Sequence, residues 1–256
     1  METKLFVAGL VLSAANAFGA VYYVATDGND SNAGSVDSTM YTSAILIQAS
    51  YLHLKGFEVR NVPMKYNSNV GVYISRSKHI FLEQINSHHN KGAGFFVNER
   101  GTGSGGVHYQ TSGDTTKFYG CRAWWNSDDG WDFISQEFPV VIENSFAMGH
   151  GYSDYGTKHP ANANGNGFKA GSSQAGTGRH IIRNCVAWNN YSSGFYANHS
   201  SVGNYWYNNT SYNNRGNQFN MWASSWDAAG NRTDGVVLTG ANAHVMKNNI
   251  AFPNKT

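Results

Sequence analysis

Residues 181–189 read Ile-Ile-Arg-Asn-Cys-Val-Ala-Trp-Asn, and related stretches return along most of the chain. Residues 118–126 read Phe-Tyr-Gly-Cys-Arg-Ala-Trp-Trp-Asn, and residues 141–147 read Val-Ile-Glu-Asn-Ser-Phe-Ala. Looser copies lie at residues 80–90, 205–214 and 244–252. Each copy joins a short apolar run to Asn, which tolerates left-handed turns. Such self-similarity is typical of a repeat architecture.

A second pattern, Gly followed by an apolar residue, falls between successive copies. It starts at Gly71, Gly94, Gly130, Gly167 and Gly194, with spacings of 23, 36, 37 and 27 residues and a weaker echo at 218–220. These repeats leave no stretch of helical period. They predict an all-β parallel β-helix, a solenoid with one coil per repeat. A barrel or sandwich is the alternative, but it does not explain the repeated register.

The composition supports a folded chain that is poor in helix. The 256 residues include 29 Gly, 30 Asn and only 4 Pro, and 13% are charged. Gly and Asn favour turns over helices. The net charge is +2 without any block of like charge, which argues against a nucleic-acid partner. No run of about 18 apolar residues is present, so we expect no membrane span.

The N-terminus has the pattern of a secretion signal. Lys4 is followed by an apolar run over residues 5–12 and by Ala15-Asn16-Ala17, a small-x-small cleavage pattern. We therefore expect a signal peptide over residues 1–17, a cap over 18–56 and the β-helix over 57–256, in a secreted, extracellular protein. Because solenoid ends are usually capped, we expect a monomer.

Aligning the Gly patterns predicts which side chains share a face. Neighbouring residues of a strand point to opposite sides. One column is apolar, and we assign it to the interior: Val72, Phe95, Trp131, Phe168, Phe195 and Phe219. The next column should face solvent: Tyr73, Phe96, Asp132, Lys169, Tyr196 and Asn220.

This alignment brings charged residues together. Asp132 and Lys169 fall on neighbouring coils, about 4.8 Å apart at the backbone, although 37 residues separate them. Asp128 and Asp129 lie in the turn just before the same strand. Three carboxylates so close together repel each other unless a cation neutralises them. Oxygen ligands favour a hard ion, Ca²⁺ above Mg²⁺, although a salt bridge with two turn aspartates is the simpler alternative.

The two cysteines, Cys121 and Cys185, occupy matching positions two coils apart. Their backbones should then lie about 9–10 Å from each other, which is beyond disulfide reach. We therefore expect two free, buried thiols.

Two motifs resemble polysaccharide lyase family 9. They are Cys121-Arg-Ala-Trp-Trp-Asn-Ser-Asp-Asp-Gly-Trp-Asp-Phe133 and Gly165-Asn-Gly-Phe-Lys-Ala-Gly171. The resemblance extends to residues 183–189 and 22–31 and implies a right-handed parallel β-helix. It also implies a lyase domain that cleaves a pectic polymer containing uronate, of the pectate or rhamnogalacturonan type. Within it, Asp128, Asp129 and Asp132 match calcium ligands and Lys169 matches the catalytic base.

The chain departs from this family at one ligand position. The family's pectate lyases carry a further calcium-binding Asp on the preceding coil, where this sequence has Ala93, or Ser104 if the insertion is not counted. We expect Glu99, a backbone carbonyl or the substrate to complete the coordination, or weaker calcium binding. The segment after Ser31 is also short for the cap that the resemblance implies.

The resemblance implies Ca²⁺-assisted β-elimination, in which a neutral Lys169 takes the proton from C5 of a uronate. Water or His150 is the candidate proton donor to the leaving oxygen. Candidates for sugar stacking are Tyr73, Phe96, Tyr196, Trp124, Trp125, Trp188 and Trp206. Candidates for binding substrate carboxylates are Arg100, Lys158, Arg179 and Arg215.

Two other functions fit parts of the sequence. Asp128-Asp129 followed by Gly149-His150-Gly151 resembles part of the polygalacturonase pattern, which would imply a glycoside hydrolase on the same fold. That family's upstream Asn-Thr-Asp and downstream Arg-Ile-Lys are absent. A non-catalytic β-helix that binds glycans is the second alternative.

Overall fold

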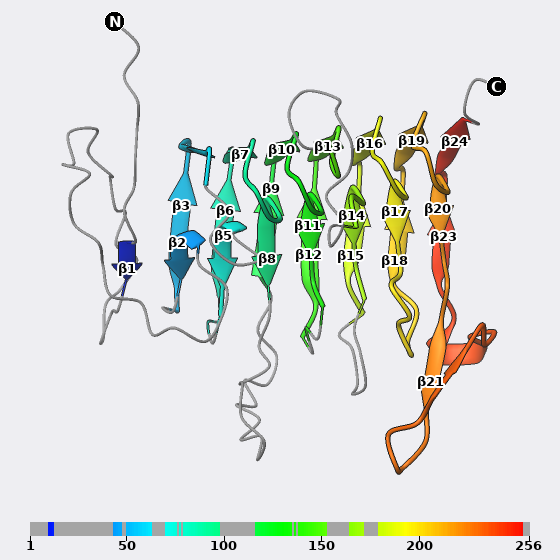
Figure 1. The fold of residues 1–256 in the computed structure, drawn as a ribbon. Coiled ribbons are helices and arrows are strands. Elements are labelled where there is room, and N and C mark those ends of the chain that lie inside the picture. Colours follow the sequence, from blue (N-terminus) through cyan, green and yellow to red (C-terminus); the bar gives the residue numbers. More distant parts are fainter. Residues whose placement is uncertain are drawn as a thin grey trace, which may run out of the picture.

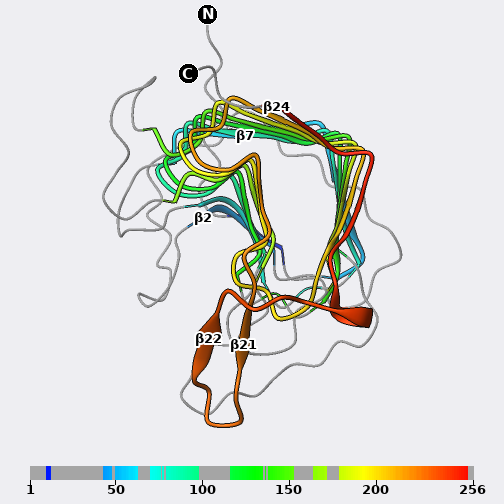
Figure 2. The ribbon, with the colours of Figure 1, turned by 90° about the vertical axis from the view of Figure 1, so that its right-hand side faces the viewer.

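The computed structural model describes residues 10–12, 43–47, 50–62, 70–75, 77, 79–97, 116–134, 136, 138–152, 164–171 and 179–252. The chain winds into a parallel β-helix whose coils stack side by side from the N-terminal to the C-terminal end (Figure 1). Seen from the C-terminal end, the coils superimpose around a shared core (Figure 2). The predicted all-β parallel β-helix is therefore confirmed.

Three parallel sheets form the walls of the solenoid. Sheet A contains β1 (Leu10–Leu12), β2 (Ser43–Ile47), β5 (Val70–Ile74), β8 (Phe95–Val97), β11 (Trp131–Asp132), β14 (Phe168–Lys169), β17 (Phe195–Tyr196) and β20 (Phe219–Asn220). Sheet B contains β3 (Leu52–Lys55), β6 (Ile80–Glu83), β9 (Thr116–Tyr119), β12 (Val140–Glu143), β15 (Ile181–Arg183), β18 (Tyr205–Tyr207) and β23 (Val245–Lys247). Sheet C contains β4 (Glu58–Arg60), β7 (Asn86–His88), β10 (Arg122–Trp124), β13 (Phe146–Met148), β16 (Val186–Trp188), β19 (Thr210–Tyr212) and β24 (Ile250–Phe252).

Two smaller elements lie near the C-terminal end. An antiparallel hairpin of β21 (Ser224–Trp226) and β22 (Arg232–Asp234) protrudes from the solenoid, and a 3-10 helix, η1 (Gly240–Asn242), follows it (Figure 2). Among the described residues, no helix has the length and apolar character needed to cross a membrane.

Parallel strands are also present before residue 57. Strands β2 and β3 precede it, and they pair in register with β5 and β6. Solenoid strands therefore begin within residues 18–56, the segment expected as a cap. Strand β1, which falls within the expected signal peptide, pairs in parallel with β2.

The interior column has the predicted members. Strand pairing places Phe95, Trp131, Phe168 and Phe195 in successive register. Their rings stack with centroids 4.9, 4.7 and 4.9 Å apart, and all four side chains are buried. Stacked rings at the coil spacing fill the core continuously, so each coil fixes the position of the next.

Polar ladders hold the turns together. Asn90, Asn126, His150, Asn190 and Asn214 occupy one position on successive coils. The backbone N–H of each of the first four donates to the side chain of the next, at 3.0 to 3.3 Å. These bonds satisfy backbone groups that the turns would otherwise leave buried without partners. They fix the turn from sheet C to sheet A in the same place on every coil.

Left-handed residues complete the turns, as the Asn-rich repeats predict. One column of positive φ contains Gln84, Gly120, Asn144, Asn184 and Asn208. Asn is favoured in such positions because its short polar side chain tolerates the left-handed region.

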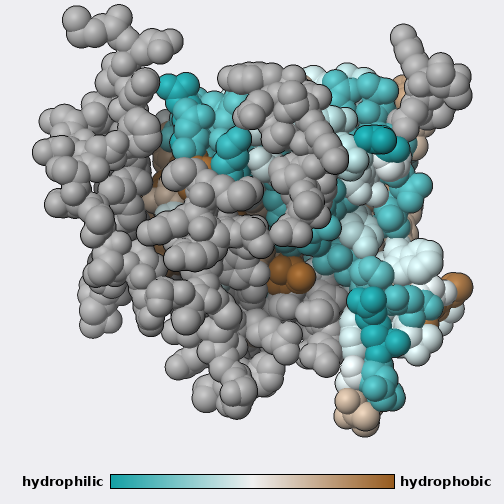
Figure 3. Space-filling model, viewed as in Figure 1, coloured by the Kyte–Doolittle hydropathy of each residue, from teal (hydrophilic) through white to brown (hydrophobic). Residues whose placement is uncertain are grey.

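On the described surface of Figure 3, hydrophilic residues dominate over the C-terminal coils, with isolated hydrophobic patches.

Candidate active site

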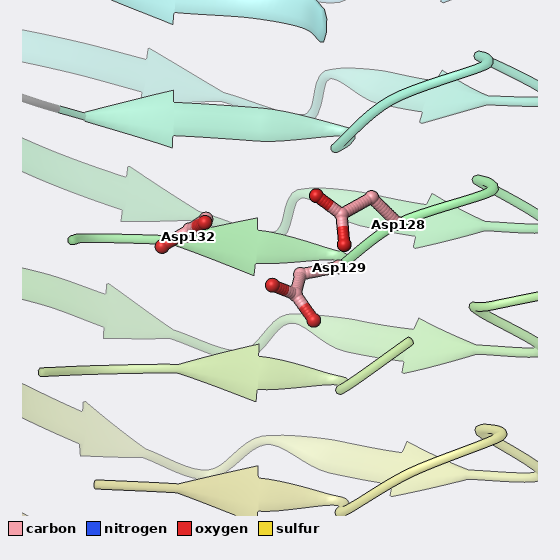
Figure 4. Close-up of side chains that lie close together, drawn as sticks. All are labelled: Asp128, Asp129 and Asp132. Atoms are coloured by element: carbon pink, nitrogen blue, oxygen red, sulfur yellow. The ribbon is translucent and has the colours of Figure 1, made fainter. Parts of the chain in front are cut away.

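The three aspartates lie on one coil, at the junction of sheets C and A. Asp128 and Asp129 belong to the turn after β10, and Asp132 lies on β11 (Figure 4). One carboxylate oxygen from each lies within 4.8 Å of the others. The predicted cluster is therefore present in the geometry.

Close packing between coils fixes this turn. Asn126, which begins the turn, accepts a hydrogen bond from Asn90 N–H and donates its own backbone N–H to His150 Nδ1. At Gly130, a Cβ atom would lie 2.6 Å from the Gly167 carbonyl oxygen and 2.6 Å from His150 Nε2. Only glycine fits this approach, and it lets the Asp turn lie tightly against the next coil.

The next coil contributes hydrogen bonds to the carboxylates. Asp128 Oδ1 accepts from the backbone N–H of Asn164 at 2.7 Å. Asp129 Oδ1 accepts from the backbone N–H and the side-chain amide of Asn166, at 2.7 and 2.9 Å. Asp132 Oδ1 instead accepts from a residue of its own coil, Ile134 N–H, at 2.9 Å. Each aspartate thus has one oxygen held by the protein, which orients the other towards the cluster.

Lys169 extends into the same cluster from the neighbouring coil. Strands β11 and β14 pair in parallel, with Asp132 directly opposite Lys169. The Lys169 ammonium donates to Asp132 Oδ2 at 3.0 Å and lies 3.3 Å from Asp129 Oδ2. The predicted stacking of an amine beside the carboxylates is confirmed by this register.

The burial of this column differs from the expectation. Lys169 is 5% exposed, Asp132 4% and Phe96 3%, so these three side chains do not face open solvent as the alternation pattern predicted. Tyr73, Tyr196 and Asn220 of the same column are partly exposed. The side chains do point away from the core, but they pack against one another. Phe96 packs with Val70 and Ala93, and Lys169 forms an ion pair with Asp132. Alternation gives the direction of a side chain but not what packs over it.

Burial and charge shift the pKa values of the cluster. Burial, with the nearby charge of Asp128, raises the pKa of Asp129 to about 8. Burial alone would lower the pKa of Lys169, but Asp132, Asp129 and Asp128 outweigh it and raise that pKa above its ordinary value. In this arrangement Lys169 pairs with Asp129 and Asp132, and its single positive charge offsets only part of the charge of the three carboxylates.

The chain is similar to a family of known proteins. The family described as "Pel9A-like, right handed beta helix region" matches residues 99–232, more than half of the chain. The chain belongs to the Pel9A-like family. "Pectate lyase L" of Dickeya chrysanthemi is 35% identical over 189 residues, which cover 66% of this chain and 43% of that protein. "Pectate lyase PEL9" of Emericella nidulans is 35% identical over 113 residues, which cover 37% of this chain and 27% of that protein.

Two solved structures share this Pel9A-like fold. "Crystal structure of pectate lyase Pel9A" superposes with a TM-score of 0.55 and 28% identity, over 69% of this chain and 41% of that one. "Rhamnogalacturonan lyase" superposes with a TM-score of 0.57 and 26% identity, over 75% of this chain and 55% of that one. This chain spans less than half the length of the curated relatives it matches. The right-handed β-helix that the sequence resemblance implied is confirmed by these matches.

Several other predicted residues are not part of this cluster. His150 is fully buried in the polar ladder, and burial lowers its pKa to about 3. It is therefore wrongly placed for a proton donor to substrate. Arg179 donates to the carbonyls of Gly203, Ala241 and Ala243, so it secures the C-terminal chain. Residues Glu99, Arg100, Ser104 and Lys158 lie outside the described residues.

The aromatic candidates divide between core and surface. Trp206 is fully buried, so it belongs to the core. Trp124 and Trp188 lie on sheet C and stack with Phe146, on a different sheet from Lys169. Ala93 is buried against Phe96, and its methyl group offers no ligand atom.

The sequence reasoning missed the two asparagines that orient the cluster, Asn164 and Asn166. Asn166 lies inside the quoted motif 165–171, three residues before Lys169. Its position on the coil after Asp129 was readable from the same alignment that paired Asp132 with Lys169. An alignment of the strands alone does not extend to the turn before them.

Proposed function

We propose that this protein is a polysaccharide lyase of family 9 that cleaves a uronate-containing polymer by β-elimination, with Lys169 as the base. The observation that carries the proposal is the Lys169 amine, 3.0 Å from Asp132 and 3.3 Å from Asp129 on the outer side of sheet A. The named activities of the relatives, pectate lyase and rhamnogalacturonan lyase, support the substrate class.

The residues present fit a divalent cation. Asp129 Oδ2 is buried and accepts no hydrogen bond from the described residues, although its other oxygen accepts two. Burial, and after it the charges of Asp128 and Asp132, raise the pKa of Asp129 to about 8, and a bound cation would offset both effects. Asp128, Asp129 and Asp132 would hold the ion with oxygen ligands alone, which favours Ca²⁺. When bound, Ca²⁺ would withdraw charge from a substrate carboxylate and from the neighbouring amine.

Lys169 would act through its protonation state. Beside three uncompensated carboxylates its amine stays protonated and cannot accept a proton. Neutralising those carboxylates lowers the amine pKa and yields the free base. Lys169 would then take the proton from C5 of the uronate, while Asp132 keeps the amine oriented.

An elimination assay tests this function. Purified protein is incubated with polygalacturonate and with rhamnogalacturonan, with Ca²⁺ and with a chelator, and the ultraviolet absorbance of the unsaturated product is followed. We expect product with at least one polymer, loss of product with chelator, and none from Lys169→Met. Polymer cleavage to saturated ends, unaffected by chelator, would support the hydrolase alternative instead.

The geometry disfavours the polygalacturonase-like alternative. Inverting hydrolysis needs an acid and a base carboxylate about 6.5–9.5 Å apart, with water between them. Here one carboxylate oxygen from each aspartate lies within 4.8 Å of the others, and His150 of the Gly-His-Gly motif is buried in the ladder. A glycan-binding protein without activity would bind polymer without cleaving it, and the same assay detects that outcome. Secretion and a monomeric state remain proposals from the sequence.

A further inference from the structure

Tyr196 is the next residue along the column that contains Lys169. Strands β14 and β17 pair in parallel, with Lys169 directly opposite Tyr196. Paired residues of a sheet point to the same side, at a strand spacing of about 4.8 Å. The phenol and the amine therefore leave the same outer face of sheet A, one coil apart.

The surroundings of Tyr196 leave its hydroxyl available. The ring is partly buried, and its edge contacts His199 with centroids 6.2 Å apart. The hydroxyl makes no hydrogen bond to any described residue, whereas its neighbour His199 is bound to Ser224 and Asp234 of the β21–β22 hairpin. Lys169 and Asp129 on one side, and Arg232 and Asp234 on the other, all interact electrostatically with Tyr196. It thus lies between the carboxylate cluster and the hairpin.

The phenol is held in its protonated form. Burial raises the pKa of Tyr196 above its ordinary value of 10, and the positive charge of Lys169 only partly opposes this. A raised pKa makes the phenol a weaker acid but keeps its proton in place at neutral pH. The acid role therefore rests on the position of Tyr196, directly opposite Lys169 on the paired strand.

We propose that Tyr196 is the general acid of the elimination, donating its phenolic proton to the glycosidic oxygen that leaves C4. This proposal rests on the lyase function proposed above. Tyr196 would supply the proton donor that the sequence suggested in His150, a residue that is too deeply buried to reach substrate.

The step balances without another reactant. The neutral Lys169 amine takes the proton from C5, and the electron pair left behind forms the C4–C5 double bond. The bond from C4 to the glycosidic oxygen breaks, and that oxygen keeps the bonding pair and takes the Tyr196 proton. The resulting phenolate regains a proton from the Lys169 ammonium beside it, so both residues return to their starting states.

The coil spacing suits this division of roles. The scissile oxygen joins two sugars, so it is displaced from C5 along the polymer. A polymer lying along the solenoid axis over sheet A would present C5 to one coil and the bridging oxygen towards the next. Base and acid on neighbouring coils match that displacement, while Asn220, one coil further, has no acidic proton.

The decisive test compares two leaving groups. Tyr196→Phe keeps the ring and removes only the hydroxyl, and Tyr207→Phe on sheet B is the matched control. Each variant is assayed on the cleaved polymer and on an oligouronide whose C4 substituent is fluoride, which leaves without protonation. We expect Tyr196→Phe to lower kcat on the polymer about a hundredfold or more. KM should be unchanged and the fluoride substrate should react at nearly the wild-type rate, while Tyr207→Phe behaves as wild type on both.

Three outcomes are informative. An equal loss on both substrates, or a change in KM alone, would overturn the acid role and leave Tyr196 as a positioning residue. Full activity of Tyr196→Phe on the polymer would also overturn it, while the lyase function would stand. Absence of elimination by the wild-type protein would instead refute the proposed function itself.

Discussion

At the residue scale, the charge on Lys169 depends on what neutralises the carboxylates beside it. The amine ion-pairs with Asp132 and Asp129, and all three side chains are buried. A buried charge persists only when it is paired. Lys169 and a divalent cation are therefore alternative partners of one carboxylate cluster, and this competition links metal binding to the availability of the base.

Asp129→Asn tests the contribution of one ligand. The amide would keep an oxygen for the Asn166 hydrogen bonds but would remove the buried negative charge. We expect the dissociation constant for Ca²⁺, measured by calorimetric titration, to rise about tenfold or more, without loss of fold by circular dichroism. Unchanged affinity would show that the ion does not bind at this cluster.

His150→Asn tests the assignment of His150 to the ladder. His150 is buried in its neutral form, and its pKa falls from 6.5 to about 3 on folding. The contribution of this residue to the free energy of unfolding is thus fully present above pH 6.5. Between pH 6.5 and 3 it falls by about 1.4 kcal/mol for each unit by which the pH is lowered. Because the other ladder members are Asn, His150→Asn should fold.

The measurement for His150→Asn is the free energy of unfolding in denaturant between pH 7 and 4. We expect a shallower pH slope than in wild type, with elimination activity retained. A steeper slope, or activity lost from a folded variant, would contradict the structural role. His180→Asn is a useful parallel, because burial also lowers its pKa to about 3.

At the scale of elements, the sheet C to sheet A turn positions the aspartates because backbone approaches backbone there. Gly130 has no room for a side chain against Gly167 of the next coil. Two other glycines of the column, Gly94 and Gly194, also have no room for a Cβ atom. The glycines therefore set how tightly the coils stack at the site.

Gly130→Ala tests this close approach. The added methyl group must displace the Gly167 carbonyl or the His150 ring, and we expect a loss of about 1–3 kcal/mol in the free energy of unfolding. The matched control is Gly120→Asn, at a left-handed turn position where the next two coils carry Asn144 and Asn184. It should change stability by less than about 1 kcal/mol. Equal effects of both substitutions would refute the packing argument.

The strand register, and with it the pairing of Asp132 with Lys169, could be predicted from the repeats. The reason is physical, because each coil repeats the same sequence position and a solenoid places equal positions side by side. The burial of Lys169 and the role of His150 could not be predicted in this way. Burial depends on what packs over a face, and a histidine replaces Asn in a ladder only because Nδ1 accepts the same backbone hydrogen bond.

At the scale of the whole molecule, the coils share one continuous core, which also encloses the two thiols. Cys121 and Cys185 are buried and free, as the register predicted. Burial raises the pKa of Cys121 to about 11 and that of Cys185 to about 12. Both thiols are thus protonated and unreactive in the folded chain.

Thiol labelling tests the integrity of the stack. In native buffer we expect neither cysteine to react with a thiol reagent over the time in which both react in denaturant. Under partial denaturation the two should become reactive together, because their coils are joined by one core. A disulfide between them, or rapid labelling of one in native buffer, would show that the stack differs from this structure.

The central claim is that Lys169 and the three aspartates form a single site across two coils. Calorimetric titration of Ca²⁺ into Lys169→Met tests it directly, with Lys117→Met, whose amine pairs with Glu143 on sheet B, as the control. Removing the competing ammonium should tighten Ca²⁺ binding about tenfold or more relative to wild type, while the control binds as wild type does. Equal affinities in wild type and Lys169→Met would mean that the amine and the ion do not share the aspartates.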